Sequence, residues 1–245
     1  AKELPEKTEQ IIYCEMNENQ EKMYEKTKSF YRNQILGSIS NFGIEKSKLQ
    51  ILKGLLQLRQ IANHPILADT NYSGGSGKFD EVSEKLYTAI QGNHKVLIFS
   101  QFVKHLEVFK KKLNQEGIRF SYLDGSMDQK SREKEIYLFN NEQDRPVFLI
   151  SLKAGGVGLN LTAADYVFVL DPWWNPAAER QAIDRAYRIG QNKNVFVYKF
   201  ISSKTVEEKI LGLQEKKSGL AEGLIKVENS FLSKISQEDL DEILG

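Results

Sequence analysis

Two arginines three residues apart are the clearest candidates in this sequence for phosphate chemistry. Arg185 and Arg188 lie in NPAAERQAIDRAYRIGQ, which spans residues 175–191. At 3.6 residues per turn they share a polar stripe with Gln181 and Asp184, opposite an apolar face. Two planar, permanently charged guanidinium groups on one stripe can both reach a phosphate chain. The competing interpretation is a solvated face on which Asp184 pairs with Arg188, and the stripe alone slightly favours it.

A glycine-rich loop shifts that balance toward phosphate binding. The sequence SLKAGGVGLNLTAA, residues 151–164, directly follows a predicted buried strand. Gly156 and Gly158 allow backbone amides to approach a ligand closely, and Lys153 and Thr162 add side-chain donors. In open parallel sheets, ligands bind at the loops that follow the carboxyl ends of the strands. A loop of this kind can also serve only to turn the chain, so it supports a binding site only together with its neighbours.

Two adjacent tryptophans follow another predicted strand. Trp173 and Trp174 lie in DPWWNP, a loop bounded by prolines. Both side chains cannot point into the same core, so we expect at least one to be exposed and able to stack on a sugar or base. The alternative is that both pack beneath the helix that follows.

One segment resembles a phosphate-binding P-loop but lacks the required residues. GGSGKF, residues 74–79, has Tyr72 where the motif requires its first glycine, and no Ser or Thr follows Lys78. Each of these positions has a role in holding phosphate or magnesium, so the segment fails as a P-loop. The glycine-rich loop at residues 151–164 is not a P-loop either.

The elements that must position these residues follow from the apolar pattern. From about Val96 onward, short apolar runs alternate with amphipathic stretches, which is typical of an α/β fold. Several runs are continuously apolar, which predicts a parallel sheet buried between layers of helices. The five predicted strands are Lys95–Ser100, Ile118–Leu123, Pro146–Ser151, Tyr166–Asp171 and Val195–Ile201.

Amphipathic helices are predicted between these strands. Apolar residues within 102–113 recur at spacings of four, three and four, and Gly117 ends that helix. Ser126 and Gln129 have the spacing of a capping box at the start of the next helix. The arginine-bearing helix is expected to begin at Pro176, because proline suits the first helical position.

The first 90 residues predict a helical protrusion instead of a sheet. Its second helix ends at His64-Pro65, and the glycine-rich segment 71–77 is a flexible connection to the α/β part. The residues expected to face inward are Met23, Thr27, Phe30 and Ile35 in the first helix and Ile51, Leu55, Leu58 and Ala62 in the second.

Helical periodicity returns after Lys204, with Val206, Ile210 and Leu213 expected to face inward. A polar tail follows. It contains three apolar residues that can either dock on the domain or remain free, namely Leu240, Ile243 and Leu244.

Composition limits the class of protein. The 245 residues are 40% hydrophobic and 27% charged, as in an ordinary globular domain. No apolar run reaches the roughly 18 residues of a membrane span, so we expect an intracellular protein without a membrane partner. The single cysteine, Cys14, excludes an internal disulfide framework and is expected to be a core residue. A net charge of +1 neither requires nor excludes nucleic acid.

Five stretches in this order resemble the carboxy-terminal half of the Swi/Snf family of superfamily 2 helicase-like ATPases. They agree with that family in order, spacing and residue identity, and together they span nearly the whole chain. The stretches are LLQLRQIANHP (55–65), VLIFSQF (96–102), YLDGSM (122–127), SLKAGGVGLNLTAADYVFVLDPWWNP (151–176) and QAIDRAYRIGQ (181–191).

The resemblance implies a fold and a set of domains. It implies a second RecA-like lobe, an α/β fold with a parallel sheet flanked by helices, a helical protrusion and a carboxy-terminal brace. The implied boundaries are residues 1–15 for the connection from a first lobe, 16–70 for the protrusion, 71–203 for the lobe and 204–245 for the brace and tail. The tail after Ser218 matches nothing in the family pattern.

The resemblance also implies roles for individual residues. ATP with Mg²⁺ is expected between this lobe and a first lobe of the same parent chain, which would supply the P-loop and the magnesium site. Arg185 and Arg188 look like arginine fingers, with Gln181 organising the interface and Gly156 and Gly158 near the ribose or phosphates. The residues implied in gripping double-stranded DNA are Ser100, Gln101, Lys153, Asn160, Thr162 and Trp174.

The other partners and the alternatives also follow from this resemblance. Proteins bound to DNA are a further possible class of substrate, and no metal ligand is expected in this lobe itself. Without the first lobe the chain is expected to be inactive in hydrolysis. A catalytically silent module that binds DNA or protein is one alternative. An RNA helicase lobe is the other, although LRQIANHP and the protrusion resemble the DNA enzymes instead.

Overall fold

A computed structural model describes residues 5–152, 154, 159–173, 176–184, 191–218 and 235–245. The chain forms two compact units. The first comprises Ala1–Ile12, Glu81–Trp173 and Ala177–Phe200. The second comprises Tyr13–Asp80, Trp174–Pro176 and Ile201–Gly245. No helix among the described residues is long and apolar enough to span a membrane.

Within the described residues, six strands form one sheet, in the order β1-β6-β5-β2-β4-β3. The pairs β2/β4, β2/β5, β3/β4 and β5/β6 are all parallel, which confirms the predicted parallel sheet. The edge strand β1 lies in the segment interpreted from the sequence as a connection. The strands are β1 (Lys7–Cys14), β2 (Val96–Ser100), β3 (Phe120–Leu123), β4 (Val147–Ser151), β5 (Tyr166–Val169) and β6 (Val195–Ser202).

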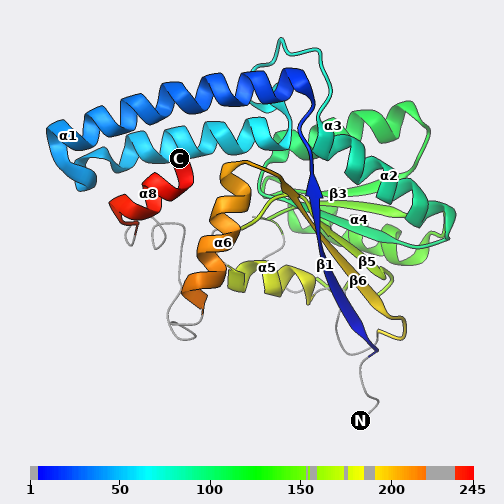
Figure 1. The fold of residues 1–245 in the computed structure, drawn as a ribbon. Coiled ribbons are helices and arrows are strands. Elements are labelled where there is room, and N and C mark those ends of the chain that lie inside the picture. The colour runs from blue at the N-terminus through cyan, green and yellow to red at the C-terminus, as the bar shows by residue number, and fades with distance from the viewer. Residues whose placement is uncertain (1–4, 153, 155–158, 174–175, 185–190, 219–234) are drawn as a thin grey trace. The chain divides into compact units, whose positions relative to one another are not determined.

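Helices cover both faces of this sheet. Leu97 and Phe99 point to one face and pack with residues of α4 (Gln129–Asn141) and α5 (Pro176–Ile183). Val96 and Ile98 point to the other face and are also fully buried. Figure 1 shows α2 (Gly77–Gln91) and α3 (Val103–Gln115) on that second side. Burial on both sides explains why the strand sequences are continuously apolar.

The helix boundaries confirm some of the predicted signals and correct one. Gly117 has a positive φ of 69° just after α3, as expected of a helix-ending glycine. The helix α4 is capped by Asp128, which accepts from the Ser131 amide at 2.8 Å, and not by Ser126. Ser126 donates through both its amide and its hydroxyl to Asp124 instead. The side chain of Ser126 is therefore bonded to Asp124 and does not cap the helix, as the predicted capping box required.

The second unit is built on a helical hairpin. The element α1 (Glu18–Asn63) contains Gly43 with φ 78° and ψ 167°, where the chain reverses between two antiparallel arms (Figure 1). The arms approach closely at Gly54, where a Cβ would lie 3.1 Å from atoms of Tyr31 and Ile35. The helix ends at Asn63 before His64, as predicted. Phe30 was expected to face inward but is 54% exposed, which corrects that prediction.

The remaining helices of this unit pack on the hairpin. The short η1 (Pro65–Leu67) follows α1. The helices α6 (Val206–Ser218) and α8 (Gln237–Leu244) share one core cluster with α1. The predicted inward residues Val206, Ile210 and Leu213 are buried there. In the tail, Leu240, Ile243 and Leu244 are at most 2% exposed, so this end of the chain docks.

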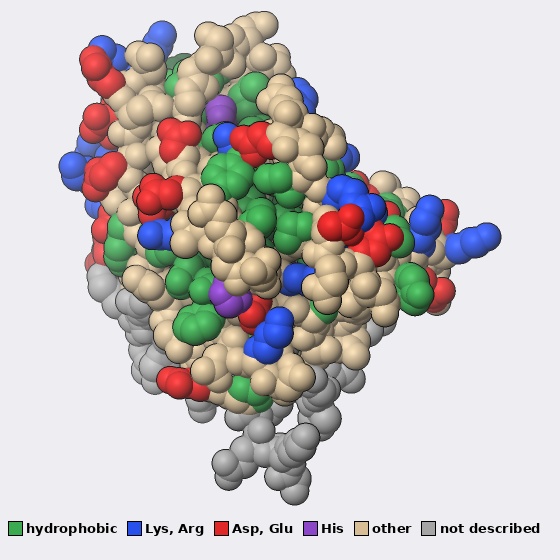
Figure 2. Space-filling model, turned by 90° about the vertical axis from the view of Figure 1, so that its right-hand side faces the viewer, with side chains coloured by type: hydrophobic (Ala, Val, Ile, Leu, Met, Phe, Trp, Pro, Cys, Tyr) green, Lys and Arg blue, Asp and Glu red, His purple; other side chains and the backbone are tan. Residues whose placement is uncertain are grey.

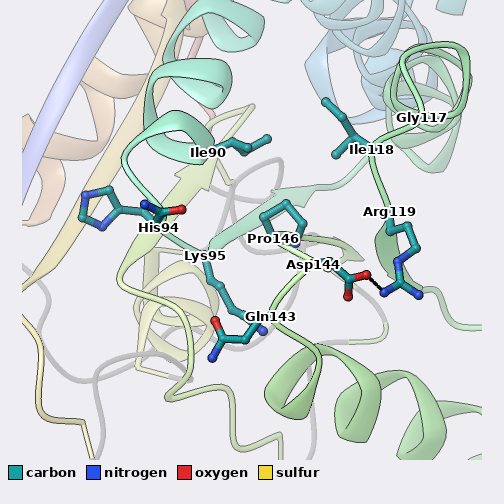
Figure 3. A pocket seen from close by; sticks show the side chains of 10 residues that line it. Ile90, His94, Lys95, Gly117, Ile118, Arg119, Gln143, Asp144 and Pro146 are labelled. Carbon is teal, nitrogen blue, oxygen red and sulfur yellow. Dashed lines mark ion pairs between the residues drawn. The ribbon is translucent and has the colours of Figure 1, made fainter.

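A hollow of about 360 Å³ opens at the amino ends of the strands (Figure 3). Lys95, Arg119 and Pro146 line it, and each directly precedes one of the strands β2, β3 and β4. Its charges are largely satisfied, because Arg119 pairs with Asp144 and Lys95 donates to the carbonyl of Glu142 at 2.8 Å. Acidic and basic side chains are interspersed on the face drawn in Figure 2. This hollow lies opposite the edge where a ligand site was predicted.

Candidate nucleic-acid and nucleotide interface

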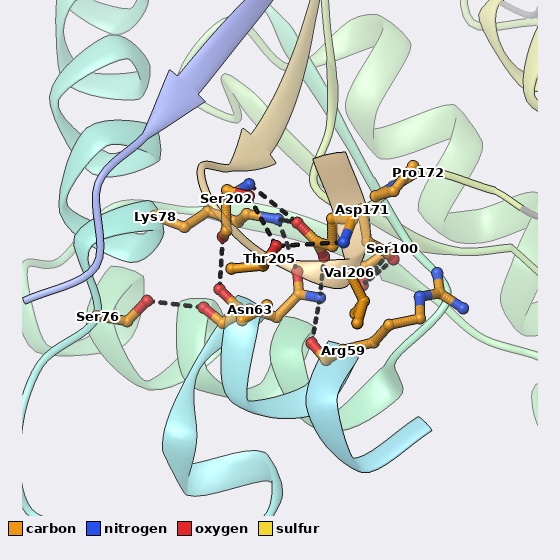
Figure 4. A network of polar contacts seen from close by, with 12 residues as sticks. Arg59, Asn63, Ser76, Lys78, Ser100, Asp171, Pro172, Ser202, Thr205 and Val206 are labelled. Atoms are coloured by element: carbon orange, nitrogen blue, oxygen red, sulfur yellow. Dashed lines mark hydrogen bonds and ion pairs between the residues drawn. The ribbon is translucent and has the colours of Figure 1, made fainter. Parts of the chain in front are cut away.

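Asp171 joins the loops that follow two neighbouring strands, β2 and β5. It is fully buried, and its carboxylate accepts from the Gln101 amide at 2.9 and 3.0 Å and from the Ser100 hydroxyl at 3.3 and 3.2 Å (Figure 4). Gln101 also donates from Nε2 to the carbonyl of Pro172 at 2.8 Å. Because charge-assisted hydrogen bonds are the stronger ones, these contacts fix the carboxyl-end loops against each other. The sequence marked Gln101 but not Asp171.

Ser100 and Gln101 differ in accessibility. Ser100 is fully buried, and its oxygen also accepts from the Phe102 amide at 3.0 Å. Its hydroxyl therefore serves the loop and is not presented at the surface. Gln101 is half-buried and lies where the loop reaches solvent. The pair was predicted to grip DNA together, but of the two only Gln101 is exposed enough to touch a ligand.

The tryptophan loop is anchored by its first tryptophan. Trp173 is 3% exposed and meets the ring of Phe99 edge-on, with centroids 6.4 Å apart. Trp174 lies outside the described residues, so the expectation that at least one of the two indoles is exposed stays a prediction. The sequence assigned Trp173 no role of its own, but its burial gives it the role of holding the loop on the sheet.

An ion-pair cluster holds α5, the helix that begins the arginine-bearing segment. Lys199 on β6 contacts Glu179 on α5 at 2.8 Å and Glu9 on β1 at 3.2 Å. Burial alone lowers the pKa of Lys199, but attraction to Glu179 and Glu9 outweighs it and leaves that pKa raised. Burial likewise raises the pKa of Glu9, but the charges of Lys199 and Lys7 outweigh it and leave that pKa lowered. The helix is thus attached to two strands through one half-buried cation.

The described part of the polar stripe faces solvent. Ala182 and Ile183 are 3% and 1% exposed, whereas Gln181 and Asp184 on the opposite side are exposed. Arg185 and Arg188 lie outside the described residues. The chain is anchored again at Gln191, which donates to the carbonyl of Ala164 at 2.8 Å. Gln191 is therefore held by the backbone that leads into β5.

The glycine-rich loop is held at its edges by α4. Arg132 donates to the Ala154 carbonyl at 2.6 Å, and Asn140 donates to the Asn160 carbonyl at 3.0 Å. Asn160 is exposed and Thr162 is half-buried, so both can reach a ligand. Lys153, Gly156 and Gly158 lie outside the described residues. The sequence pointed to neither Arg132 nor Asn140, because their role depends on a tertiary contact that no local motif records.

Lys78 has a structural environment that accounts for the GGSGKF segment. Its amine contacts Glu207 at 2.5 Å, and both side chains are fully buried. Glu207 also accepts from Asn63 Nδ2 at 2.8 Å and from the Ser202 amide at 3.0 Å (Figure 4). Lys78 therefore connects helices within the second unit and does not face solvent, where a phosphate would bind.

Two family models match this chain. The "Helicase conserved C-terminal domain" matches residues 77–190, and the "SNF2-related domain" matches residues 1–67. An "Uncharacterized ATP-dependent helicase" of Mycoplasma pneumoniae is 38% identical over 98% of this chain. The chain spans only 23% of the length of that relative.

Solved structures from Sulfolobus solfataricus resemble the chain over nearly its whole length. The "SWI2/SNF2 ATPase C-terminal domain" is 31% identical with a TM-score of 0.79, and the match covers 97% of this chain and 98% of that one. The "SWI2/SNF2 ATPase core in complex with dsDNA" is 35% identical with a TM-score of 0.83, and the match covers 98% of this chain and 50% of that one.

Proposed function

Because this chain belongs to the Swi/Snf family of helicase-like ATPases, as its carboxy-terminal RecA-like lobe, we propose that it is the second motor lobe of an ATP-dependent translocase acting on double-stranded DNA. The observation that carries the proposal is the way in which α5 is held against the sheet. Its apolar side is buried, the Glu179–Lys199 pair fixes it, and its polar side faces solvent. A polar surface held this rigidly suits a charged ligand that must be positioned.

In this proposal, Arg185 and Arg188 act on a nucleotide bound between the two lobes. ATP with Mg²⁺ supplies the phosphoryl group, and a first lobe of the parent chain holds the metal and the P-loop. The two guanidinium groups stabilise negative charge that develops during phosphoryl transfer, a contribution of about 10³ to 10⁵ in rate in other nucleotide hydrolases. Gln181 organises the interface, and Gly156 and Gly158 let the backbone approach the ribose or phosphates.

The DNA grip is assigned to the carboxyl-end loops. Gln101, Asn160 and Thr162 reach solvent there, and Lys153 and Trp174 belong to the same loops in sequence. We assign Ser100 to positioning instead, because its buried hydroxyl is bonded to Asp171. Contacts of this kind go to phosphate and sugar, so binding would not depend on base sequence. Relative movement of two such grips with each ATP would step the motor along a duplex.

The test is ATP hydrolysis by the intact parent and by this chain alone, each with duplex DNA, single-stranded DNA or RNA. Stimulation of the parent chiefly by duplex, with an inert isolated chain, supports the proposal. Stimulation chiefly by RNA would assign the lobe to an RNA helicase. A parent that is inert with every nucleic acid would leave a silent binding module and overturn the motor mechanism. Proteins bound to DNA remain a proposed class of substrate for the parent.

A further inference from the structure

The second arm of the α1 hairpin, residues 44–63, is apolar on two separate faces. Ile51, Leu55 and Leu58 on one face are fully buried against the rest of the unit. Three leucines on the other face, centred about 125° around the helix axis from the first, are exposed by 79%, 39% and 43%, namely Leu49, Leu52 and Leu56. We call these three the leucine face. Their spacing of three and four places them within an arc of about 60° around the helix axis.

Two lysines lie beside this leucine face, within a basic stretch of the sequence. Residues 26–53 contain six Lys or Arg and one Glu, a local net charge of +5 in a chain whose total is +1. Lys46 and Lys53 are exposed and lie about 40° to 60° around the helix from Leu49, beside the leucine face. An exposed apolar stripe bordered by cations is complementary to a helix that carries an apolar stripe bordered by carboxylates.

The molecule already binds one helix of that pattern. The helix α8, with sequence QEDLDEIL, carries four acidic residues and no basic one. It docks on α1 through Leu240, Ile243 and Leu244, which are at most 2% exposed (Figure 1). Two lysines complete the contact, because Lys28 donates to the Gly245 carbonyl at 2.6 Å and Lys209 to the Glu242 carbonyl at 2.9 Å. The second unit thus holds an acidic amphipathic helix by apolar burial and by lysine contacts to backbone carbonyls at its carboxy-terminal end.

We propose that the leucine face, with Lys46 and Lys53, docks an acidic amphipathic helix of a partner protein. A helix of this kind buries the three leucines and brings its carboxylates to the two lysines. A DNA duplex fits less well, because its phosphates pair with lysines but leave the leucines in water. A second copy of the chain fits less well too, because it presents the same positive charge. The leucine face shares no residue with the proposed motor site.

The test uses the intact parent protein and a fluorescent synthetic peptide. The peptide carries two tandem copies of SQEDLDEIL, residues 236–244, because a single copy is too short to be helical in water. We expect saturable binding that weakens with added salt. Replacing all three leucines, Leu49→Gln with Leu52→Gln and Leu56→Gln, should weaken binding at least about tenfold, because each leucine loses part of its burial. Lys46→Glu with Lys53→Glu should weaken it too.

Two controls keep the result specific. Tyr137→Gln changes another exposed apolar residue, 66% exposed on α4, and should leave peptide affinity unchanged. A peptide of the same composition with its leucines and isoleucines moved off one face should not bind. Because the readout is peptide affinity and not hydrolysis, the proposed motor function can fail without affecting this result.

Three outcomes would overturn the proposal. Peptide affinity that is unchanged in the leucine variant would place the peptide elsewhere, such as at the site of α8. Loss of duplex affinity in the Lys46→Glu and Lys53→Glu variant, without peptide binding by the parent, would make the surface a DNA contact. Labelling of Leu52→Cys by a water-soluble maleimide in the free parent that is as slow as labelling of the buried Cys14 would show that the parent itself covers the face.

Discussion

At the scale of single residues, the buried pair of Lys78 and Glu207 explains a segment whose sequence resembles a phosphate site. Both charges are fully buried 2.5 Å apart, and Asn63 and Ser202 complete the hydrogen bonds of the carboxylate. Breaking such a pair from one side leaves an uncompensated buried charge, which costs about 3–5 kcal/mol in comparable cases. The motif rules excluded this lysine from phosphate binding, but only the fold identifies its partner.

We therefore expect Lys78→Met to lower the free energy of unfolding of the 245-residue chain by about 3–5 kcal/mol. Adding Glu207→Gln should restore part of that loss, because Gln removes the unpaired charge and keeps one oxygen that accepts from either Asn63 or Ser202. Urea unfolding of the two variants and the unaltered chain measures both effects. A double variant no more stable than Lys78→Met would show that the cost does not come from the isolated carboxylate.

Arg188 provides the residue-scale test of the motor proposal. In the parent protein, Arg188→Ala should reduce DNA-stimulated ATP hydrolysis by about 10³ or more, because it removes a charge that stabilises the transferring phosphoryl group. Duplex affinity should stay nearly unchanged. Arg180→Ala is a matched control, because Arg180 is exposed on α5 and lies outside the proposed finger pair. Equal loss of hydrolysis and of DNA affinity in Arg188→Ala would contradict the finger role.

At the scale of elements, the sequence predicted what depends on apolar periodicity. The buried strands and the inward face of residues 44–63 were correct, because burial imposes a repeat that can be read locally. The predicted cap of α4 was wrong. Ser126 and Asp128 are both suitable residue types for a cap, and Asp128 takes this role because Ser126 is bonded to Asp124. The prediction that Phe30 faces inward was also wrong, because the fold decides which elements pack against each face of the hairpin.

The same limit applies to the candidate site. The carboxyl-end loops could be predicted, because parallel strands bring their carboxyl ends to one edge of a sheet. The residues that hold those loops could not, since Asp171, Glu179 and Arg132 act on positions far away in sequence or on backbone carbonyls. Ser100 illustrates the difference, because its type suited a DNA contact but its burial assigns it to the loop.

The cluster of Lys199, Glu9 and Glu179 gives an element-scale prediction. The charges of Lys199 and Lys7 outweigh partial desolvation and leave the pKa of the exposed Glu9 lowered, so ionised Glu9 stabilises the fold above about pH 4.5. That contribution is lost as the pH falls through the lowered pKa. Lys199→Met should therefore destabilise the chain at pH 7, and its deficit relative to the unaltered chain should shrink between about pH 4.5 and pH 3.

Urea unfolding at pH 7, 5, 4 and 3 measures this deficit. Lys111→Met, which replaces an exposed lysine on α3, is the control and should show little deficit at any of these pH values. The raised pKa of Lys199 acts at the other end of the scale, because its stabilising charge is lost only as the pH rises through that pKa. A Lys199→Met deficit that is constant from pH 7 to pH 3 would mean that packing, and not charge, holds α5.

At the scale of the whole molecule, positive charge is distributed unevenly. The chain has a net charge of only +1, yet residues 26–53 carry +5. The loops assigned to the DNA grip contain one candidate cation, Lys153. Two different surfaces can therefore attract phosphates, and the number of cations engaged distinguishes them through the salt dependence of binding.

We expect the isolated chain to bind duplex DNA with a shallow salt dependence. Each phosphate neutralised contributes about −0.9 to the slope of log affinity against log salt concentration. Engagement of Lys153 alone then predicts a loss of about three- to fourfold between 50 and 200 mM salt. Binding through the six cations of residues 26–53 would instead predict a loss of about 10³. Fluorescence anisotropy with a labelled duplex across this range separates the two, and a loss near 10³ would move the DNA contact from the carboxyl-end loops to the hairpin.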